Sequence, residues 1–353
     1  MIRIRVAILD KDEIYTGRLI NAFNTYYQDK LEAYSFTETD IALDFLQNNK
    51  IDVLLVDESI DIKSLKIPQN CAYAYLTVMN SVDSIGDVTA ICKYMKVDLI
   101  YKEILSVFSE GSQYSIVTGN QDGNATPVSL FVSAAGGTGA SSVAAAYATY
   151  KARSGFKPLL INLERFGGAG CFFQGEGNMN LSDIIFALKS KKANLALKLE
   201  SSVKVSPNGV CFIDTANLVL DVMELKDDDI INLINEACSM QSFDEIIVDI
   251  GFSMKELDFT LIEKASKVIL VSDGSEIANA KTVRCIESMQ ILDQQKEKNL
   301  VGKISLFYNR FSSRLGKRIE NLNVNTIGGV PRIEGSVSQI IDSIAGNSDL
   351  QKI

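Results

Sequence analysis

The amino-acid sequence predicts an α/β protein with two domains, each built on a doubly wound parallel sheet. Short apolar runs alternate with segments of helical periodicity, as in successive βα units. Residues 111–127, which are rich in Gly, Ser, Asn and Gln, interrupt this alternation. The chain has 353 residues, enough for two domains with a core each. We therefore expect a first domain at 1–110, a linker at 111–127 and a second domain at 128–353.

The composition excludes several classes of function. Hydrophobic residues make up 46% and charged residues 22%, and the formal net charge is −9, which argues against a broad electrostatic grip on DNA or anionic lipid. The six cysteines are scattered without a CxxC pair, and there is no histidine, so neither a zinc site nor histidine-based nucleophilic chemistry is expected. The N-terminus does not read as a signal peptide, and no apolar run approaches about 18 residues. We expect a cytoplasmic protein with no DNA binding and no direct membrane anchor.

The first domain is expected to alternate strands and helices in a regular order. Its predicted strands lie at 5–10, 32–36, 52–57, 72–78 and 97–102, and its predicted helices lie near 13–25, 40–48 and 84–94. The second domain is expected to continue the pattern. Its predicted strands lie at 129–134, 158–164, 209–215, 244–251, 267–273 and 303–309, and one clear helix lies at 227–240.

A glycine-rich loop opens the second domain. Residues 133–142 read SAAGGTGASS and stand between an apolar run and a stretch of small residues. A strand, a glycine turn and a helix start make a cradle for phosphate groups, because backbone N–H groups converge there at the positive end of the helix dipole. Such loops normally carry a lysine, and this one has none.

Polar residues follow several of the other predicted strands. Ligands bind beyond the carboxyl ends of the strands in an open parallel sheet. Asp249 ends one apolar run, as a carboxylate that holds Mg²⁺ does. Asn162 and Glu164 follow another run, and Asn309 offers an amide to a purine edge. A later segment supplies Gly329-Val330-Pro331.

This set resembles the MinD/ParA family of deviant Walker A ATPases, and most of all its CpaE/TadZ branch, over about residues 128–345. The resemblance is carried by the loop, by FDEIIVDIG with Asp249, by YNRF, by IGGVPR and by LSDIIFAL at 181–188. It implies that ATP and Mg²⁺ are bound, with Ser141 and Asp249 on the metal. The implied nucleotide contacts come from Gly136, Gly137, Thr138, Gly139, Ala140, Ser141, Ser142, Asn309, Arg310 and Pro331.

The sequence departs from the family pattern at the two lysines of the loop and in the D-x-D motif after the second strand, which reads Asn162-Leu163-Glu164. Ala140 replaces the lysine that contacts phosphate, and Ala135 replaces the lysine that crosses to the partner's nucleotide. Glu164 stands at the usual position of the catalytic aspartate. A charge-assisted hydrogen bond contributes roughly 1.5–3 kcal/mol, so ATP binding survives with a loss of about one to two decades. A cation supplied in trans is worth about 10³–10⁵ in rate, so we expect little or no hydrolysis.

Two other interpretations of the loop remain open. The segment from Gly137 to Ser142 also reads as G-x-G-x-x-S, and Glu164 follows the next strand as ribose recognition in a dinucleotide site requires. That interpretation leaves Asp249 and Asn309 without a role. The loop also fits a strand–helix turn that binds no ligand, since two missing lysines are what a decayed site shows.

The first domain resembles the receivers of response regulators. Asp10 ends the first strand, Asp57 stands at the phospho-acceptor position, and Thr77 and Lys102 end later strands. Lys11 replaces the second acid of the usual pair, so the domain is expected to be a pseudo-receiver that works through contacts. The alternative is that Asp12 supplies the missing ligand and Asp57 is phosphorylated.

The CpaE/TadZ resemblance implies a homodimer that localises or organises the assembly machinery of type IV (Tad/Flp) pili. Its implied partners are pilus or secretion assembly proteins, which would recruit it to a cell pole or to the inner face of the membrane. Two alternatives from other classes are a phosphorylatable response regulator with an ATPase-like output domain and an active ATPase of the partitioning type.

Overall fold

The computed structural model describes residues 3–111, 126–190, 194–314 and 316–353. Its contacts divide the described residues into two units. Unit 1 comprises those of Met1–Val117 and Ala187–Ser201, and unit 2 comprises those of Thr118–Phe186 and Ser202–Ile353. Most of the predicted linker, residues 111–127, lies outside the described residues. Among the described helices, none is both long enough and apolar enough to cross a membrane.

Unit 1 is built on a six-stranded sheet with the order β2-β1-β3-β4-β6-β5. Its strands are β1 (Ile4–Leu9), β2 (Leu31–Phe36), β3 (Val53–Asp57), β4 (Ala72–Thr77), β5 (Ser84–Ile85) and β6 (Val88–Cys92). All are parallel except the edge strand β5. Its helices before the linker are α1 (Glu13–Tyr26), α2 (Thr39–Asn48), the short η1 (Ile62–Ser64) and α3 (Val97–Gly111).

The side chains of β1 alternate between the two faces of this sheet. Val6 and Ile8 pack with α1 and α3, whereas Ala7 and Leu9 pack with α2. The period of two is the one that a sheet buried on both faces requires. The fold class predicted for the first domain is therefore confirmed, with one antiparallel strand added at its edge.

Two elements predicted for the first domain are wrong. The helix expected near 84–94 is a hairpin, in which Ser84 and Ile85 pair antiparallel with Thr89 and Val88. Gly86 takes the positive φ of +63° that this tight turn needs. The strand expected at 97–102 is instead the start of α3, where Ile100, Ile104 and Phe108 are buried at intervals of four residues.

Unit 1 includes a helix that the sequence places far from its other elements. This helix, α6 (Leu195–Ser202), follows the described part of α5 and packs in unit 1 up to Ser201. Lys198 is 2% exposed, and its Nζ lies 2.8 Å from both Glu110 Oε1 and Ser106 Oγ of α3. Glu200 Oε1 accepts a hydrogen bond of 2.6 Å from Lys30 Nζ. Polar contacts therefore fix the position of α6 in this unit.

Unit 2 is built on an eight-stranded sheet with the order β14-β13-β12-β7-β11-β8-β10-β9. Its strands are β7 (Val128–Val132), β8 (Pro158–Asn162), β9 (Val203–Val205), β10 (Cys211–Ile213), β11 (Glu245–Asp249), β12 (Lys267–Ser272), β13 (Ile304–Phe311) and β14 (Asn325–Pro331). The edge strand β9 is antiparallel to β10, and the other pairs are parallel. The predicted parallel sheet is confirmed, and β9 and β14 extend it on both sides.

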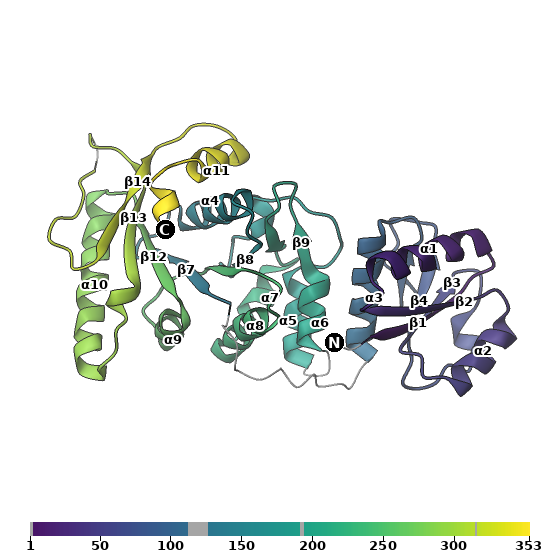
Figure 1. Cartoon of the computed structure of the whole chain (residues 1–353). Helices are drawn as coiled ribbons and strands as arrows, with labels where there is room; N and C mark the ends of the chain where they lie inside the picture. Colours follow the sequence, from purple (N-terminus) through teal and green to yellow (C-terminus); the bar gives the residue numbers. More distant parts are fainter. Residues whose placement is uncertain (1–2, 112–125, 191–193, 315) are drawn as a thin grey trace. The chain divides into compact units, whose positions relative to one another are not determined.

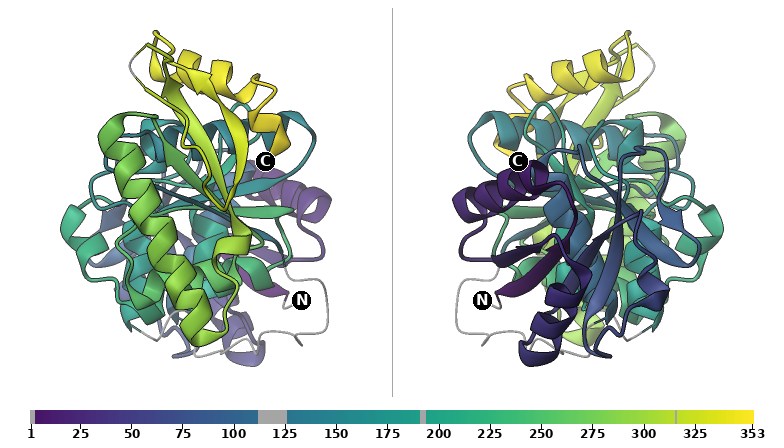
Figure 2. Two further views of the ribbon diagram at one scale, coloured as in Figure 1. Left: turned by 90° about the vertical axis from the view of Figure 1, so that its left-hand side faces the viewer. Right: turned by 90° about the vertical axis from the view of Figure 1, so that its right-hand side faces the viewer.

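Helices cover both faces of this sheet (Figure 1). The described helical segments that complete unit 2 are α4 (Ala140–Arg153), η2 (Ala169–Cys171), α5 (Leu181–Ser190) as far as Phe186, α7 (Val219–Met223), α8 (Asp227–Ser239), α9 (Glu256–Lys264), α10 (Glu276–Lys296), η3 (Val301–Lys303), α11 (Val337–Ala345) and η4 (Leu350–Lys352). Helices α4 and α11 pack together on one face, and α8 and α9 lie on the other. The long α10 lies at the end of the sheet that holds β13 and β14 (Figure 2).

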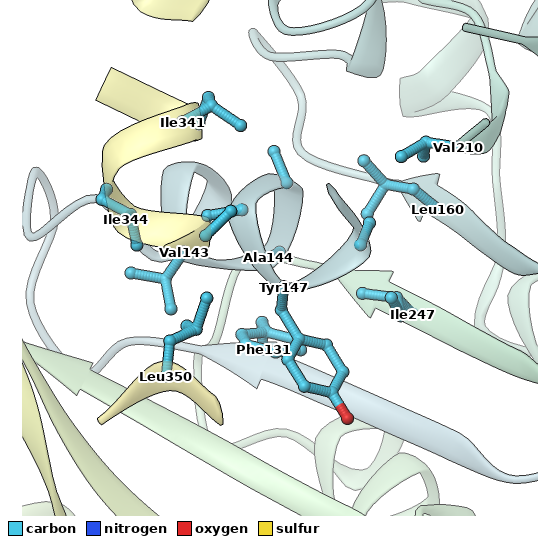
Figure 3. Close-up of a cluster of buried hydrophobic side chains, with 14 of the residues drawn as sticks. Phe131, Val143, Ala144, Tyr147, Leu160, Val210, Ile247, Ile341, Ile344 and Leu350 are labelled. Atoms are coloured by element: carbon cyan, nitrogen blue, oxygen red, sulfur yellow. The ribbon is translucent and has the colours of Figure 1, made fainter. Parts of the chain in front are cut away.

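The core of unit 2 is centred on α4, whose residues from Val143 to Thr149 are all buried. Small alanine side chains let this helix lie close to the sheet, and Tyr147 reaches down beside Phe131 of β7 (Figure 3). Ile344 of α11 and Leu350 of η4 close the cluster from the other side. This packing holds the start of α4 firmly at the carboxyl end of the central strands.

The other end of the central strands contains a buried carboxylate. Glu245, at the start of β11, is 3% exposed, and its oxygens lie 2.9 Å from Lys151 Nζ and 3.5 Å from Lys267 Nζ. Ser129 also donates a hydrogen bond to it. Burial alone raises the pKa of Glu245, but the Ser129 and Lys151 hydrogen bonds and the charge of Lys267 outweigh burial and hold the pKa below its ordinary value.

We expect Glu245→Gln to destabilise the protein at pH 7 by about 2–4 kcal/mol. A lowered folded-state pKa stabilises the protein above the unfolded-state pKa of about 4.3, and this contribution is lost as the pH falls through the folded-state value. The loss should therefore shrink toward pH 3. Urea unfolding at several pH values measures it. Glu236→Gln is the matched control. Burial raises the pKa of Glu236, so this substitution should change the stability at pH 7 in the opposite direction from Glu245→Gln. An equal loss at pH 3 and pH 7 would contradict the prediction.

Candidate nucleotide site

The glycine-rich loop joins β7 to the first turn of α4, as predicted. Gly137 and Gly139 have φ angles of +80° and +86°, which glycine adopts without strain. A Cβ atom on Gly139 would lie 2.3 Å from Asn309 Nδ2, so this position accepts glycine alone. Gly136 and Gly137 are exposed, and no described heavy atom lies within 4 Å of an added Cβ at either residue, chain neighbours apart. The backbone of the loop is therefore open to a ligand on that side.

Two consecutive residues at the end of β13 hold the loop from outside. Asn309, which is 2% exposed, donates from Nδ2 to the carbonyl oxygen of Thr138 at 2.8 Å. Arg310 donates from Nη1 to the carbonyl oxygen of Gly137 at 3.1 Å. An irregularity in the pairing of β13 with β14 lies at this point, and Arg310 has a φ of +57°. The bulge directs both side chains to the loop.

Asp249 ends β11 beside the first turn of α4. It is 1% exposed, and its Oδ2 accepts a hydrogen bond of 2.6 Å from Asn162 Nδ2. Its Oδ1 is buried without a hydrogen-bond partner among the described residues. Burial and the charge of Glu164 raise the pKa of Asp249 to about 7, although hydrogen bonding with Ser141 and Asn162 acts in the opposite direction.

These residues fit a divalent cation better than they fit an empty interior. An unpartnered buried carboxylate oxygen costs free energy, and a cation bound at that oxygen removes the cost. The Ser141 hydroxyl adds a second oxygen close to Asp249. Among the described residues, no cluster of three or more carboxylate or cysteine side chains has metal-binding spacing. A Mg²⁺ ion at Ser141 and Asp249 would have few protein ligands, which is the arrangement in sites that share the cation with a phosphate.

Asn162 connects the two acids of the site. Its side-chain oxygen accepts a hydrogen bond of 3.0 Å from the backbone N–H of Glu164, while its amide holds Asp249. An asparagine here donates a hydrogen bond to Asp249, where an aspartate would add a third negative charge. Glu164 itself is half-buried and lies on the wall of a cavity of about 650 Å³. Its carboxylate is therefore accessible beside Asp249.

Pro331 is the last residue of β14 and is exposed. It lies in register with Phe311, two residues beyond Asn309. The structure thus joins Asn309 and Arg310 to the loop through hydrogen bonds, brings Ser141 close to Asp249, and places Pro331 on the strand next to β13. The hydroxyl of Ser133, which contacts Ala135 and Thr138 inside the loop, was not predicted as a site residue.

Unit 1 has an acidic pocket at the carboxyl ends of β1 and β3. Lys93, which follows β6 and is 7% exposed, lies 2.6 Å from Asp10 Oδ2 and also pairs with Asp57 Oδ2. Ser59 donates to the other oxygen of Asp57 from its backbone N–H at 3.1 Å and from its hydroxyl. Thr77 ends β4 and is fully buried. Both oxygens of the predicted phospho-acceptor are therefore engaged.

The lysine assigned to this pocket from the sequence was wrong. Lys102 lies within α3, because the expected strand at 97–102 is a helix, and Lys93 takes the strand-end position. The signal was the β-branched run of Val88, Thr89 and Ile91 after the Gly86 turn. Lys11 is exposed, and the Asp12 carboxylate caps α1 by accepting from two backbone N–H groups.

We expect Lys93→Met to destabilise the protein by about 3–5 kcal/mol at pH 7, because it leaves two carboxylates without their cation. Burial alone raises the pKa of Asp57, but the Lys93 and Ser59 hydrogen bonds hold it below its ordinary value. The loss should therefore shrink as the pH falls toward 3 and the carboxylates are protonated. Thermal unfolding across this range measures it, with the exposed Lys11→Met as control. Equal losses in the two variants would contradict the assignment of Lys93.

The geometry of unit 2 defines a class of protein. A parallel sheet whose glycine loop leads into a helix, with a buried aspartate at the end of the neighbouring strand, is the architecture of P-loop proteins. The loop of this chain differs from theirs because Ala140 stands at the position of the lysine.

Comparisons with known proteins specify both units. Residues 2–109 match the family model described as "TadZ-like, receiver domain". The structure is similar to a ParA family ATPase from Chlorobium tepidum TLS, with 23% identity, a TM-score of 0.52, and coverage of 65% of this chain and 96% of that one. The septum site-determining protein MinD from Pyrococcus horikoshii OT3, complexed with Mg-ADP, has 16% identity, a TM-score of 0.48, and coverage of 62% and 94%. No curated protein matches the chain.

A TadZ-like receiver domain is therefore followed by a domain with the MinD/ParA ATPase fold.

Proposed function

We propose that this protein binds ATP with Mg²⁺ in unit 2, hydrolyses it very slowly or not at all, and acts through its nucleotide-bound form. One observation carries this proposal. The loop keeps an open backbone and a buried aspartate with an unpartnered oxygen, although Ala135 and Ala140 stand where the lysines of the family are found. Binding elements are present, and both lysines that accelerate phosphoryl transfer in the family are replaced by alanine.

Each group of residues in the site has a separate role in binding ATP·Mg²⁺. The backbone N–H groups of the loop and the start of α4 attract phosphate oxygens. Ser141 and Asp249 would hold Mg²⁺, which neutralises phosphate charge when bound. Arg310 brings a positive charge to the loop. Glu164 is placed to accept a proton from water beside Asp249, but a base without a cation at the phosphates gives little acceleration.

Released nucleotide and calorimetry test the binding. We expect freshly purified protein to release ATP on denaturation, or nucleotide-free protein to bind ATP·Mg²⁺ with micromolar affinity. Asp249→Ala should weaken the Mg²⁺-dependent affinity at least tenfold. Asp273→Ala, which also removes an acid at a strand end, should leave it unchanged. If no nucleotide is released and none binds, the loop is a structural turn, and the proposal is wrong.

We further infer that ATP favours a homodimer. A nucleotide acts as such a switch only if it binds the dimer more tightly than the monomer. Sedimentation of the protein with and without a non-hydrolysable ATP analogue measures this coupling. We expect the dimer fraction to rise with the analogue in the wild type and to stay constant in Asp249→Ala. Equal affinity for the analogue in monomer and dimer would contradict the coupling.

The receiver-like unit is proposed to act through contacts, because Lys93 and Ser59 occupy both oxygens of Asp57. Acetyl phosphate with Mg²⁺ should therefore give no species heavier by about 80 Da in an intact-mass spectrum, since the acceptor is not free for phosphorylation. Such a species, absent from Asp57→Ala, would instead support the response-regulator alternative.

In the cell, we propose that the protein localises or organises Tad/Flp pilus assembly in the cytoplasm. The match of residues 2–109 to the TadZ-like receiver domain supports this setting. A fluorescent fusion should form foci where pili assemble, and Asp249→Ala should disperse them. Normal piliation in cells that lack the protein would contradict the proposal.

A further inference from the structure

A hydroxyl network lies inside the lysine-free loop. Ser133, the first residue after β7, accepts hydrogen bonds from the backbone N–H of Ala135 at 3.1 Å and from Thr138 Oγ1 at 2.8 Å. The single proton of Ser133 Oγ is shared between the carbonyl oxygens of Ala135, at 2.7 Å, and Val271 of β12, at 2.8 Å. One hydroxyl therefore connects the base of the loop, its tip and the adjacent strand.

Thr138 is held at two points. Its hydroxyl donates to Ser133, and its carbonyl oxygen accepts from Asn309 at 2.8 Å. The side chain is 2% exposed, although Gly137 before it is exposed and Gly139 after it is half-exposed. Thr138 is thus the buried anchor of a loop that otherwise consists of small, conformationally free residues.

We propose that the Ser133–Thr138 pair, defined here as the hydroxyl brace, holds the loop in its ligand-ready conformation and so takes over the organising part of the missing lysine's role. The proposal rests on the nucleotide binding proposed above. Glycine loses more conformational freedom on ordering than any other residue, and Gly136, Gly137 and Gly139 all lie in this loop. A loop that is ordered before binding does not have to pay that entropy when the phosphates arrive.

The hydroxyl brace replaces only one of the two contributions that a lysine makes. An ammonium group attracts phosphate oxygens and donates hydrogen bonds to the loop carbonyls. Ser133 and Thr138 are neutral, so they provide order without attraction. Adding a lysine to the loop should therefore help most where the brace has been removed.

Matched substitutions at Thr138 test the hydroxyl brace. Thr138→Val removes the hydroxyl and keeps the shape, whereas Thr138→Ser keeps the hydroxyl and loses the methyl group. We expect affinity for a non-hydrolysable ATP analogue with Mg²⁺ to fall about three- to tenfold in Thr138→Val and in Ser133→Ala. Thr138→Ser should stay within about twofold of the wild type, because a methyl loss does not touch the hydrogen bond. The double variant should lose no more than Ser133→Ala alone, because that variant already removes the Thr138–Ser133 bond together with the other bonds of the Ser133 hydroxyl.

Three further measurements distinguish an effect on the order of the loop from an effect on the stability of the whole protein. Amide exchange of the ligand-free loop should be faster in Thr138→Val than in Thr138→Ser. Thr149→Val removes a buried hydroxyl from the middle of α4, where it bonds Ala145, and should lower stability without changing affinity. The gain in affinity from Ala140→Lys should be larger in Thr138→Val than in the wild type.

The results distinguish the hydroxyl brace from the proposed function. A wild type that binds no analogue contradicts the proposed function, and the brace with it. A wild type that binds, with Thr138→Val binding equally well, overturns the brace alone. Equal gains from Ala140→Lys in both backgrounds would likewise overturn it, because the lysine and the brace would then act independently.

Discussion

Asp249→Asn is expected to stabilise the protein in the absence of metal at pH 8 and to abolish its Mg²⁺-dependent affinity for ATP. The wild-type carboxyl is 1% exposed and has a pKa of about 7, so at pH 8 the folded protein holds a buried negative charge. Each unit by which folding raises the pKa of the Asp249 carboxyl lowers the free energy of unfolding by about 1.4 kcal/mol at a pH where the carboxyl is ionised. We expect a gain of about 2–4 kcal/mol in the variant.

The sign of this effect changes with pH in a defined way. A raised folded-state pKa means that the folded protein binds more protons than the unfolded chain between about pH 4 and pH 7. The wild type should therefore lose stability relative to Asp249→Asn as the pH rises through this range, and the difference should be constant above it. Urea unfolding in the presence of a chelator measures the difference at pH 4, 6 and 8.

Asp273→Asn is the matched control for Asp249→Asn. Asp273 also follows a strand of the same sheet, and its Oδ1 accepts a hydrogen bond from the backbone N–H of Ser275, which an asparagine oxygen also accepts. This variant should show neither the gain at pH 8 nor the loss of ATP binding. A destabilised Asp249→Asn at pH 8 without metal would show that the carboxylate contributes to the fold itself, and the metal-site assignment would lose its main support.

Restoring the lysines should have the largest effect on rate. Ala140→Lys is expected to tighten ATP binding about tenfold to a hundredfold. Ala135→Lys combined with Ala140→Lys should raise the rate of ATP hydrolysis by about 10³-fold or more, because a positive charge in trans stabilises the transition state. Phosphate release under single-turnover conditions measures the rate, and thermal unfolding shows whether the variants are folded.

Ala140→Met separates charge from bulk in this experiment, because methionine has a similar length to lysine and no charge. It should bind ATP no more tightly than the wild type. If Ala140→Lys and Ala140→Met behave alike, the loop does not place residue 140 at the phosphates. If the double lysine variant binds ATP but remains inactive, Glu164 and Asn162 in place of aspartates are the remaining differences from the family pattern, and Glu164→Asp in that background tests the first of them.

The sheet of unit 2 was predictable because its strands are buried on both faces and therefore appear as uninterrupted apolar runs. The same property placed Asp249 correctly at the end of its strand, whereas β13 continues two residues beyond Asn309. The contacts between them were not predictable. Asn309 meets Thr138 across 171 positions of sequence, and only the packing of β13 beside β12 brings them together.

Unit 1 shows where the sequence pattern was ambiguous. Residues 97–102, VDLIYK, are as apolar as a short strand, and their helical period appears only when the buried Ile104 and Phe108 are included. The hairpin at Gly86 was missed as well, because residues 84–94 were assigned to a helix although Val88, Thr89 and Ile91 favour a strand. These two errors together moved the lysine of the acidic pocket from Lys93 to Lys102.

The packing of α6 in unit 1 has a consequence for the order in which the chain is made. Lys198 and Glu200 supply contacts to Ser106, Glu110 and Lys30, which are synthesised about 90 to 170 positions earlier. At about 5–20 residues per second, the ribosome needs several seconds to reach α6 after it has finished α3. During that interval the face of α3 that receives α6 is uncovered on the nascent chain. The amino-terminal unit therefore completes its fold only after the first strands of the following unit have already been made.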